Sequence, residues 1–420
     1  MADIEIRTFD DTDDDAIAEF GRVINGVFGG QPAIFGRRAK EAVRAPGRRL
    51  VAYAGDDLVG TAGAFTMGLT VPGGRTVPVA GVSAVSVQAT HRRRGILRKV
   101  MARQLDDIVA AGEAIAVLNA SEAAIYRRFG YGVASWHQGL ELDTRRALFR
   151  ERAGDDLDLR LFTPGTATDA HALVAAIYER WRPMRPGTLV WNDAWFDGLL
   201  GAERTWLGGG PLSVVVCEPG DGHGGGYALY TIDRGSPGEW TLDARHVVAD
   251  DPVVEARLWR YLLEVDLIGT VRVEMAPLDT PMRWLITDPR QVRVTEHRDW
   301  LHVRVLDVVA ALTARTYARA DDLVIDVVDA FRDTEATNGR FRLSSSAAGE
   351  AACERLGGGG AGGQADLTLD IAALGSLFLG GVSVTELAAA GLVSASEPDG
   401  LRRADALFRG DVVPFCITHF

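Results

Sequence analysis

The sequence of 420 residues is too long for one ordinary hydrophobic core, because a single domain usually holds roughly 100 to 200 residues. Apolar residues make up 47% of the chain, but no uninterrupted apolar stretch approaches the roughly 18 residues of a membrane-spanning helix. The net charge of −12 argues against nucleic acid as a partner, since phosphate binding needs a cationic surface. It is compatible with a cationic small molecule.

The amino-terminal sequence lacks the basic region and apolar core of a secretory signal, so we expect a cytoplasmic protein. Cys217, Cys353 and Cys416 are odd in number and far apart, which favours reduced thiols over a disulfide framework. No metal-ligand spacing joins these cysteines to the eight histidines, and no metal site is expected.

The first predicted helix follows an acidic run at residues 10–15. Acidic side chains are favoured at this end of a helix by its dipole, so we interpret the run as a solvated helix start. A role in an acceptor pocket, shared with Phe28, is the alternative. The apolar positions with helical spacing are Ile17, Phe20, Val23, Ile24, Val27 and Phe28.

Residues 50–65 predict two strands joined by a turn at Gly55, Asp56 and Asp57. A third strand is predicted from about Val77 to Val87, and a basic turn, residues 91–95, follows it. A helix then begins directly, with apolar residues at Ile96, Leu97, Val100, Met101, Leu105, Ile108 and Val109.

The middle of the chain repeats this order of elements. In place of the basic turn it has Ala249-Asp250-Asp251, which offers carboxylates to an incoming phosphate. We therefore expect a degenerate, structural copy. The predicted strands are residues 213–217, 227–232 and 240–248, and the predicted helix is residues 252–265.

From about residue 306 the pattern becomes mixed helix and strand. The glycine-rich stretch at residues 357–363 is interpreted as a flexible loop, because it lacks the Lys-Ser/Thr pair of a phosphate-binding P-loop. Strands are predicted at residues 323–328 and 339–343, and an apolar helix at residues 371–378.

The basic turn carries the strongest functional signal. Amide N–H groups at a helix start are unpaired and favour anions, and Gly95 permits close backbone approach. Arg92, Arg93, Arg94 and Arg98 lie where the helix dipole disfavours cations, by roughly 0.3 to 1 kcal/mol each. This placement indicates an anionic ligand rather than the alternative, a solvated basic patch.

The stretch Arg92-Arg-Arg-Gly95-Ile-Leu97 resembles the cofactor motif of GNAT acetyltransferases, Arg/Gln-x-x-Gly-x-Gly/Ala, except that Leu97 replaces a small residue. A bulky residue there is typical of the Eis family, and the resemblance extends over the whole chain. The stretch from Asn119 to Gly132 and the closing Phe420 strengthen it.

The resemblance implies an α/β (α+β) fold with tandem GNAT-like domains, each a mixed and mostly antiparallel sheet with flanking helices. It implies a GNAT domain with the acetyl-CoA site at residues 1–145, a degenerate GNAT-like domain at 146–305, and a sterol-carrier-protein-like domain at 306–420.

The resemblance also implies an acetyl-CoA-dependent N-acetyltransferase without a metal, which transfers the acetyl group directly. Tyr126 would be the general acid, and the α-carboxylate of Phe420 the general base; His419 is an alternative base. Phe129 and Tyr131 are expected in the core. The implied coenzyme-binding residues are Val85, Ser86, Val87, Arg93, Arg94, Gly95, Ile96, Leu97, Arg98, Ser121 and Glu122. For Ser121 and Glu122, helix capping is the alternative.

The implied acceptor is a primary amine, on a small cationic molecule such as an aminoglycoside or on a lysine side chain, and the implied assembly is a homohexamer. A non-catalytic lipid- or acyl-CoA-binding protein with vestigial GNAT domains is the alternative from another class. Transfer of an aminoacyl or longer acyl group is the alternative within enzymes.

Overall fold

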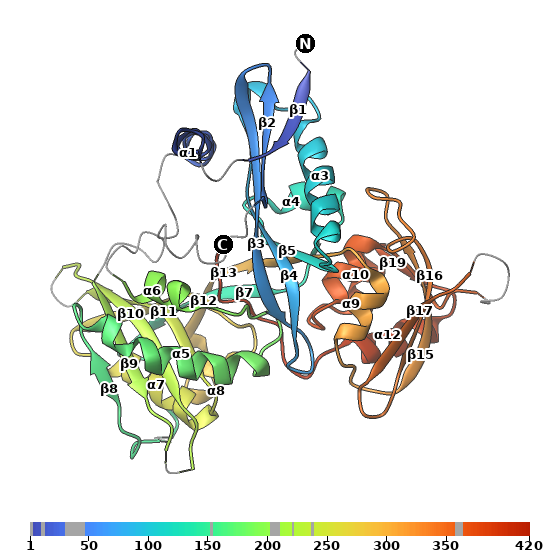
Figure 1. Ribbon diagram of the computed structural model, residues 1–420. Helices are drawn as coiled ribbons and strands as arrows, with labels where there is room; N and C mark the ends of the chain where they lie inside the picture. The colour runs from blue at the N-terminus through green and yellow to red at the C-terminus, as the bar shows by residue number, and fades with distance from the viewer. Residues whose placement is uncertain are drawn as a thin grey trace.

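The computed structural model describes residues 3–9, 13–29, 47–151, 154–201, 211–220, 222–236, 239–357 and 364–420. Within these ranges the chain forms three sheets, each with helices packed against it (Figure 1). None of the described helices is long and apolar enough to cross a membrane.

The first sheet contains seven strands in the order β1-β2-β3-β4-β5-β14-β6. Only the contact between β4 and β5 is parallel. The strands are β1 (Ile4–Thr8), β2 (Arg49–Ala54), β3 (Asp57–Thr70), β4 (Thr76–Val87), β5 (Ile115–Asn119), β14 (Leu301–Val305) and β6 (Gly132–Val133).

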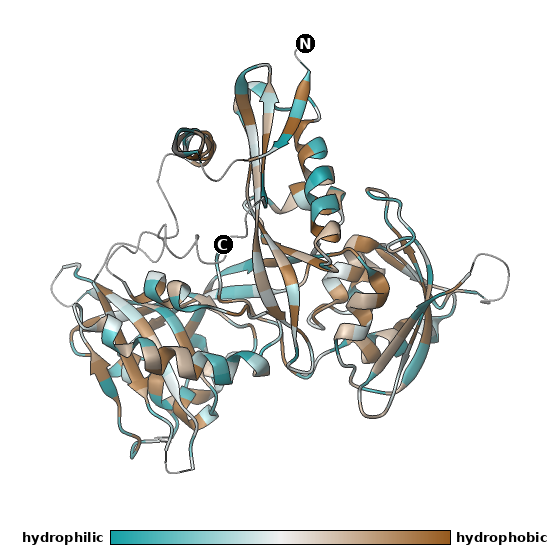
Figure 2. Ribbon diagram, viewed as in Figure 1, coloured by the Kyte–Doolittle hydropathy of each residue, from teal (hydrophilic) through white to brown (hydrophobic). Residues whose placement is uncertain are grey.

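Two helices cover opposite faces of β2 and β3. Helix α3 (Ile96–Ala110) packs on Leu50 and Ala52, whereas α1 (Asp14–Phe28) packs on Val51 between them. Alternate side chains of a strand point to opposite faces, so neighbouring residues of β2 serve the two helices. Helix α3 carries both hydrophilic and hydrophobic residues, as a helix with one buried face requires (Figure 2).

The second sheet has the order β13-β7-β12-β11-β10-β9-β8, with α5 (His171–Trp181) on one face and α7 (Pro252–Glu264) on the other. Its strands are β7 (Trp136–Asp143), β8 (Arg160–Phe162), β9 (Leu212–Cys217), β10 (Gly226–Asp233), β11 (Trp240–Ala249), β12 (Ile268–Ala276) and β13 (Val292–Asp299). The remaining helical segments are η3 (Ala167–Ala170), η4 (Arg182–Met184), α6 (Asp193–Leu200), α8 (Met282–Leu285) and η5 (Pro289–Gln291).

The two seven-stranded sheets exchange strands. Strand β7 follows the first sheet in the chain but pairs with β12 and β13 of the second sheet. Strand β14 follows the second sheet but lies between β5 and β6 of the first, with Val303 opposite Val117. The sequence predicts a domain boundary at residue 145. Each sheet contains a strand from the opposite side of this boundary. The boundary itself stays a prediction.

The third sheet has the order β17-β16-β15-β18-β19 and packs with α9 to α12. Helix α10 lies directly on the first sheet, since a Cβ at Gly132 would meet the carbonyl oxygen of Ala372 at 1.8 Å. The elements are α9 (Val308–Ala314), β15 (Asp321–Val328), β16 (Gly339–Ser345), β17 (Ala351–Arg355), β18 (Leu367–Asp370), α10 (Ile371–Leu377), α11 (Val384–Ala389), β19 (Val393–Ala395) and α12 (Pro398–Phe408).

The last residues, 409–420, have no helix or strand but run between the domains. The amide of Phe415 donates to the carbonyl of Pro186 at 2.9 Å, and Arg185 donates to the carbonyl of Val413 at 3.0 Å. The carboxy-terminus thus lies between the first sheet and the middle of the chain (Figure 1).

The helices and strands predicted from the sequence are confirmed. They correspond to α1, β2, β3, β4 and α3 in the first third, β9, β10, β11 and α7 in the middle, and β15, β16 and α10 in the last third. Asp13 caps α1 by accepting from the amides of Asp15 and Ala16. Residues 10–12 of the acidic run and 358–363 of the glycine-rich loop lie outside the described residues.

Candidate active site

The site is built around a split between the parallel strands β4 and β5. They pair at only two positions, Ala80 with Ala116 and Gly81 with Val117. Beyond these pairs β4 continues to Val87 along β3, while β5 diverges from it. Beyond Gly81, β4 has no strand pairing with β5 among the described residues, which is the arrangement that an extended ligand between them would require.

A bulge in β4 bends the strand at the split. Ser83 pairs with Gly63 and Ser86 with Thr61, so two residues of β4, Ala84 and Val85, stand opposite one residue of β3. Ala84 has φ of 55°, which is unfavourable for a residue with a side chain.

The expected residues Val85, Ser86 and Val87 therefore lie along the split. The Ser86 hydroxyl is buried and lies 2.7 Å from Thr61 Oγ1, so it already has a hydrogen-bond partner. Val85 and Val87 pack against α3, in the cluster that contains Ile96.

The basic turn, residues 91–95, lies between β4 and α3 and begins at the end of η1 (Ala89–His91). Arg93 and Gly95 both have left-handed conformations, with φ of 62° and 76°. Left-handed residues in such a turn aim successive amide N–H groups into a concavity that holds anions. A side chain at position 95 would meet nothing within 4 Å, so the backbone conformation is what favours glycine here.

The start of α3 is electrostatically open to an anion. Gly95 at the N-cap has no side chain to occupy the first amides, and no acidic residue lies in the first turn. Arg93, Arg94 and Arg98 form no ion pair within the described ranges, and Arg93 and Arg94 are exposed. A turn of this kind can hold an anionic group such as a pyrophosphate.

Leu97, the departure from the GNAT motif, packs against the cluster of buried side chains that includes Met101 and Leu105. It stands at the second position of α3, where its side chain is half-buried. A bulky residue at this position therefore fills the core beneath the helix.

Ser121 and Glu122 lie on the exposed segment between β5 and α4 (Ala123–Tyr126). Glu122 is at the N-cap of α4, but it makes no side-chain capping bond. The capping alternative is therefore wrong for Glu122.

Tyr126 ends α4 and is 7% exposed. Burial, with the nearby Glu122 carboxylate, raises the pKa of Tyr126 to about 12. Its ring lies edge-on to that of Tyr131, with ring centroids 6.0 Å apart. Both residues pack in the cluster that contains Ala80 and Ala116. Phe129, in η2 (Arg127–Phe129), and Tyr131 are buried, as predicted.

Phe420 lies at the split from the other side. Its amide donates to Asn119 Oδ1 at 3.1 Å, at the end of β5. A Cβ at Gly81 would lie 3.2 Å from Phe420 Cε2, so the ring covers the last paired residue of β4. Phe420 is 9% exposed.

Thr418 is held by two tryptophans. Trp191 Nε1 donates to Thr418 Oγ1 at 2.9 Å, and Trp300 Nε1 donates to its carbonyl at 3.1 Å. The ring of His419 lies 5.4 Å from that of Trp300. These bonds fix the backbone next to Phe420.

Tyr126 and Phe420 thus approach the split from opposite faces of the sheet. Ala80 shares a cluster with Tyr126, whereas Gly81, the next residue of β4, meets Phe420. Consecutive strand residues face opposite sides, so a group inserted between β4 and β5 can be contacted from both.

The corresponding place in the middle of the chain is blocked. The N-cap of α7 is Asp251, whose carboxylate accepts from the amides of Val253 and Val254 at 2.7 and 3.3 Å. The first amides of this helix are therefore already hydrogen-bonded to a carboxylate of the chain itself.

The sequence did not predict three parts of the site. These are the bulge at Ala84, the hydrogen bond that Asn119 accepts from the Phe420 amide, and the tryptophans that bind Thr418. Only Asn119 left a signal, since it opens the stretch that carries the resemblance. No group of three or more His, Cys, Asp or Glu side chains among the described residues could hold a metal ion.

Family models match most of the chain. Two described as "Acetyltransferase (GNAT) domain" match residues 7–134 and 187–305, and one described as "Sterol carrier protein domain" matches residues 308–417. The predicted fold class, tandem GNAT-like domains followed by a sterol-carrier-like domain, is confirmed.

Individual proteins match over similar lengths. An uncharacterized N-acetyltransferase of Streptomyces coelicolor is 44% identical over 85% of this chain and 84% of its own length. N-acetyltransferase Eis of Mycobacterium tuberculosis is 36% identical over 85% of each chain. The crystal structure of Eis1 from Mycobacterium abscessus covers both chains fully, with 34% identity and a TM-score of 0.84. A GCN5-related N-acetyltransferase from Anabaena variabilis shares the fold, with 22% identity and a TM-score of 0.80.

Proposed function

The chain belongs to the Eis family of GNAT N-acetyltransferases and is an acyltransferase, and on this premise we propose its chemistry. Acetyl-CoA, the co-substrate that the GNAT domains imply, donates its acetyl group directly to a primary amine. Tyr126 is the general acid, and the α-carboxylate of Phe420 is the general base. The approach of these two residues to one split from opposite faces carries the proposal.

The amino-terminal domain binds the coenzyme. Arg93, Arg94 and Arg98, with the first amides of α3, hold the phosphates, while the main chain at residues 85–87 holds the pantetheine arm. One β4 amide faces the thioester carbonyl and stabilises the negative charge that develops on its oxygen. Ser121 and Glu122 line the far side of the coenzyme.

Tyr126 donates its proton to the departing sulfur. A pKa of about 12 keeps the phenol protonated at neutral pH. Full transfer to a thiolate whose conjugate acid has a pKa near 8.5 is uphill by about 5 kcal/mol. Tyr126 therefore donates its proton while the C–S bond breaks, and the phenolate regains the proton that the acceptor nitrogen loses on becoming an amide, directly or through water.

Phe420 supplies the base on the opposite face. The bond from its amide to Asn119 and the bonds from Trp191 and Trp300 to Thr418 hold the main chain next to the α-carboxylate, which supports this role. The carboxylate removes a proton from the acceptor ammonium, directly or through water, so that a neutral amine attacks the thioester.

We propose that the acceptor is a small cationic molecule of the aminoglycoside type or a lysine side chain, and that the protein is a cytoplasmic homohexamer. The resemblance in sequence implies each of these assignments, and the net charge of −12 favours a cationic acceptor. Assays of acetyl-CoA consumption with a panel of amines identify the acceptor, and sedimentation measures the assembly.

Two variants test the catalytic roles. Tyr126→Phe removes the donor, and one glycine added after Phe420 displaces the carboxylate; each should lower kcat by about 10² to 10⁴ while coenzyme binding persists. Rapid-quench turnover and calorimetry with coenzyme A measure the two effects.

Because Tyr126 stays protonated up to about pH 12, the wild-type kcat should show no alkaline loss from this group below pH 10.

The matched controls are Tyr131→Phe, which changes the neighbouring phenol, and one glycine added at the amino-terminus. Both should retain turnover within about threefold, since they change neither the donor nor the carboxylate. Near-normal turnover in both test variants would exclude the assigned roles.

A further inference from the structure

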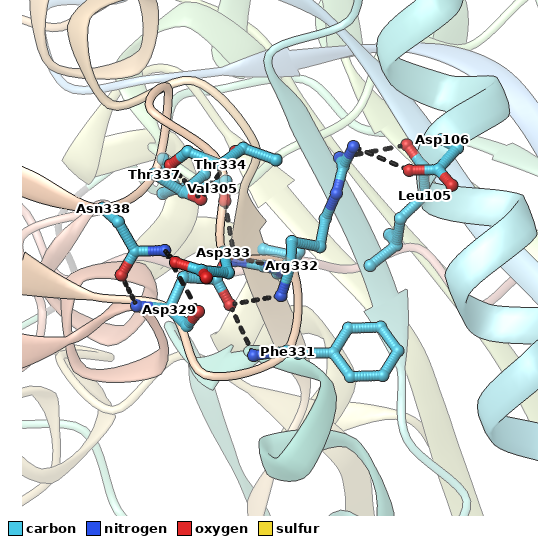
Figure 3. A network of polar contacts seen from close by, with 11 residues as sticks. Leu105, Asp106, Val305, Asp329, Phe331, Arg332, Asp333, Thr334, Thr337 and Asn338 are labelled. Atoms are coloured by element: carbon cyan, nitrogen blue, oxygen red, sulfur yellow. Dashed lines mark hydrogen bonds and ion pairs between the residues drawn. The ribbon is translucent and has the colours of Figure 1, made fainter.

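A loop of the third domain reaches across to the coenzyme-binding helix. It comprises residues 329–338, which join β15 to β16. Figure 3 shows the side chain of Arg332 extending from this loop to α3, where its Nη2 lies 2.8 Å from Asp106 Oδ1 and its Nη1 donates to the carbonyl of Leu105 at 3.3 Å.

Hydrogen bonds fix the backbone of this loop. Asp329 Oδ1 accepts from the amides of Phe331 and Arg332 at 3.1 and 3.3 Å (Figure 3). Its Oδ2 forms an ion pair with the buried Arg304 guanidinium. Asn338 closes the loop, since its Oδ1 accepts from the Asp329 amide at 2.7 Å. Phe331 is therefore held at its own amide and by its neighbour Arg332.

The ring of Phe331 meets two residues of the coenzyme domain. It contacts the ring of Phe129 edge-on, with centroids 5.1 Å apart. The guanidinium carbon of Arg98 lies 4.9 Å from its centroid, within the range of a cation–π contact. Phe331 also packs against the cluster that includes Tyr126.

Arg98 needs such a contact because its position is electrostatically unfavourable. It stands in the first turn of α3, where the helix dipole repels cations, and no described carboxylate forms an ion pair with it. The ring attracts the guanidinium without neutralising its charge, and it restricts the motion of a long side chain. A cation held in place loses less entropy when an anion binds.

We propose that Phe331 is a positioning residue for the coenzyme: its ring holds the Arg98 guanidinium ready for the phosphates of acetyl-CoA. The sterol-carrier-like domain thereby completes the phosphate site of the first domain. This inference rests on the proposed function, because it assumes that coenzyme A binds at the start of α3.

The test replaces Phe331 with leucine, which keeps apolar volume but removes the π face, and with tyrosine, which keeps both. Calorimetry with coenzyme A should show Kd raised about fivefold in Phe331→Leu and unchanged in Phe331→Tyr. If the leucine variant fails to fold, as scanning calorimetry would reveal, Phe331→Met keeps a flexible apolar side chain and takes its place.

A structural role and a positioning role are separated by comparing two thioesters. S-acetyl-pantetheine has the same reacting group as acetyl-CoA but lacks all phosphates. In Phe331→Leu, kcat/KM should fall about fivefold for acetyl-CoA and stay unchanged for S-acetyl-pantetheine, because only the former uses Arg98.

The background Arg98→Met tests that the effect passes through the guanidinium. Adding Phe331→Leu to Arg98→Met should not raise Kd further, since the cation is already gone. An equal loss for both thioesters, or additive losses in the double variant, would overturn the positioning role. Failure of the wild type to bind coenzyme A would instead overturn the proposed function, and this inference with it.

Discussion

At the scale of single residues, the ion pair between Arg304 of β14 and Asp329 is fully buried. Burial lowers the pKa of Arg304, and the attraction of Asp329 opposes that shift. The same guanidinium donates to the carbonyl of Val305 at 2.9 Å, and a Cβ at Gly130 would meet its Cζ at 2.7 Å. The pair therefore joins the first sheet to the third domain at a closely packed, fully buried point.

Replacing Asp329 with asparagine should lower the free energy of unfolding by about 3 to 5 kcal/mol, because the Arg304 charge stays buried without its partner. Denaturant titration of the variant measures this loss. The matched control is Asp107→Asn, which breaks an exposed pair with Arg103 on α3 and should cost no more than about 0.5 kcal/mol. Equal losses of unfolding free energy in the two variants would show that burial of the Arg304–Asp329 pair does not determine the cost.

Single residues also show what the sequence can and cannot predict. Gly95 could be predicted as a left-handed turn residue, because glycine is the usual residue there. The left-handed conformation of Ala84 could not, because alanine seldom adopts it and only the surrounding sheet imposes it. The contact between Arg98 and Phe331 joins positions far apart in the chain, and neither local sequence predicts it.

At the scale of elements, α3 and α7 occupy corresponding places after β4 and β11 but begin with opposite chemistry. The start of α3 leaves its amides open, whereas Asp251 fills that of α7. Burial raises the pKa of Asp251, but hydrogen bonds from the amides of Gly224, Val253 and Val254 and from His223 outweigh it, so the net pKa is lowered. The ionised carboxylate is therefore the form that stabilises α7.

Replacing Asp251 with alanine should speed hydrogen exchange of the first-turn amides of α7 about fivefold at neutral pH, because an N-cap contributes about 1 kcal/mol. The control Asp251→Asn keeps an acceptor and should stay close to the wild type. A carboxyl with a lowered pKa stabilises above its unfolded value near 3.9 and loses that effect as pH falls through the folded value. Wild-type protection should thus fall only below about pH 4, and a loss that begins near pH 6 would contradict this role.

Element type was predictable and strand pairing was not. The period of apolar residues marks α3 and α7, and the turn at Gly55 marks the hairpin of β2 and β3. Nothing local in residues 301–305 predicts that β14 inserts between β5 and β6, because pairing depends on edges supplied from elsewhere in the fold. The predicted active-site residues came from motif resemblance, and their roles stay predictions.

At the scale of the whole molecule, the exchange of β7 and β14 ties the two GNAT-like halves together. Loss of either strand leaves an open edge in the sheet that it completes. Val303 of β14 is fully buried in the first sheet, and β14 packs against α10.

We expect the two seven-stranded sheets to unfold in one transition. Val303→Ala should lower the free energy of unfolding by about 2 kcal/mol. The denaturant midpoint at which amides exchange should fall equally in β5 and in β12. Mass spectrometry of exchange in each sheet measures the two midpoints. Separate transitions, with only β5 shifted, would show that the sheets fold independently.

The exchange of strands also determines when the first sheet can be completed during translation. A ribosome adds about 5 to 20 residues per second, so about 10 to 30 s pass between the appearance of β6 and that of β14. During that interval the nascent first sheet has a gap where its sixth strand belongs, and no early fragment can adopt the final structure. The first sheet can therefore reach its final structure only after β14 has been synthesised. Until then the edge of β5 is unpaired, and a chaperone that binds this edge would act during that interval.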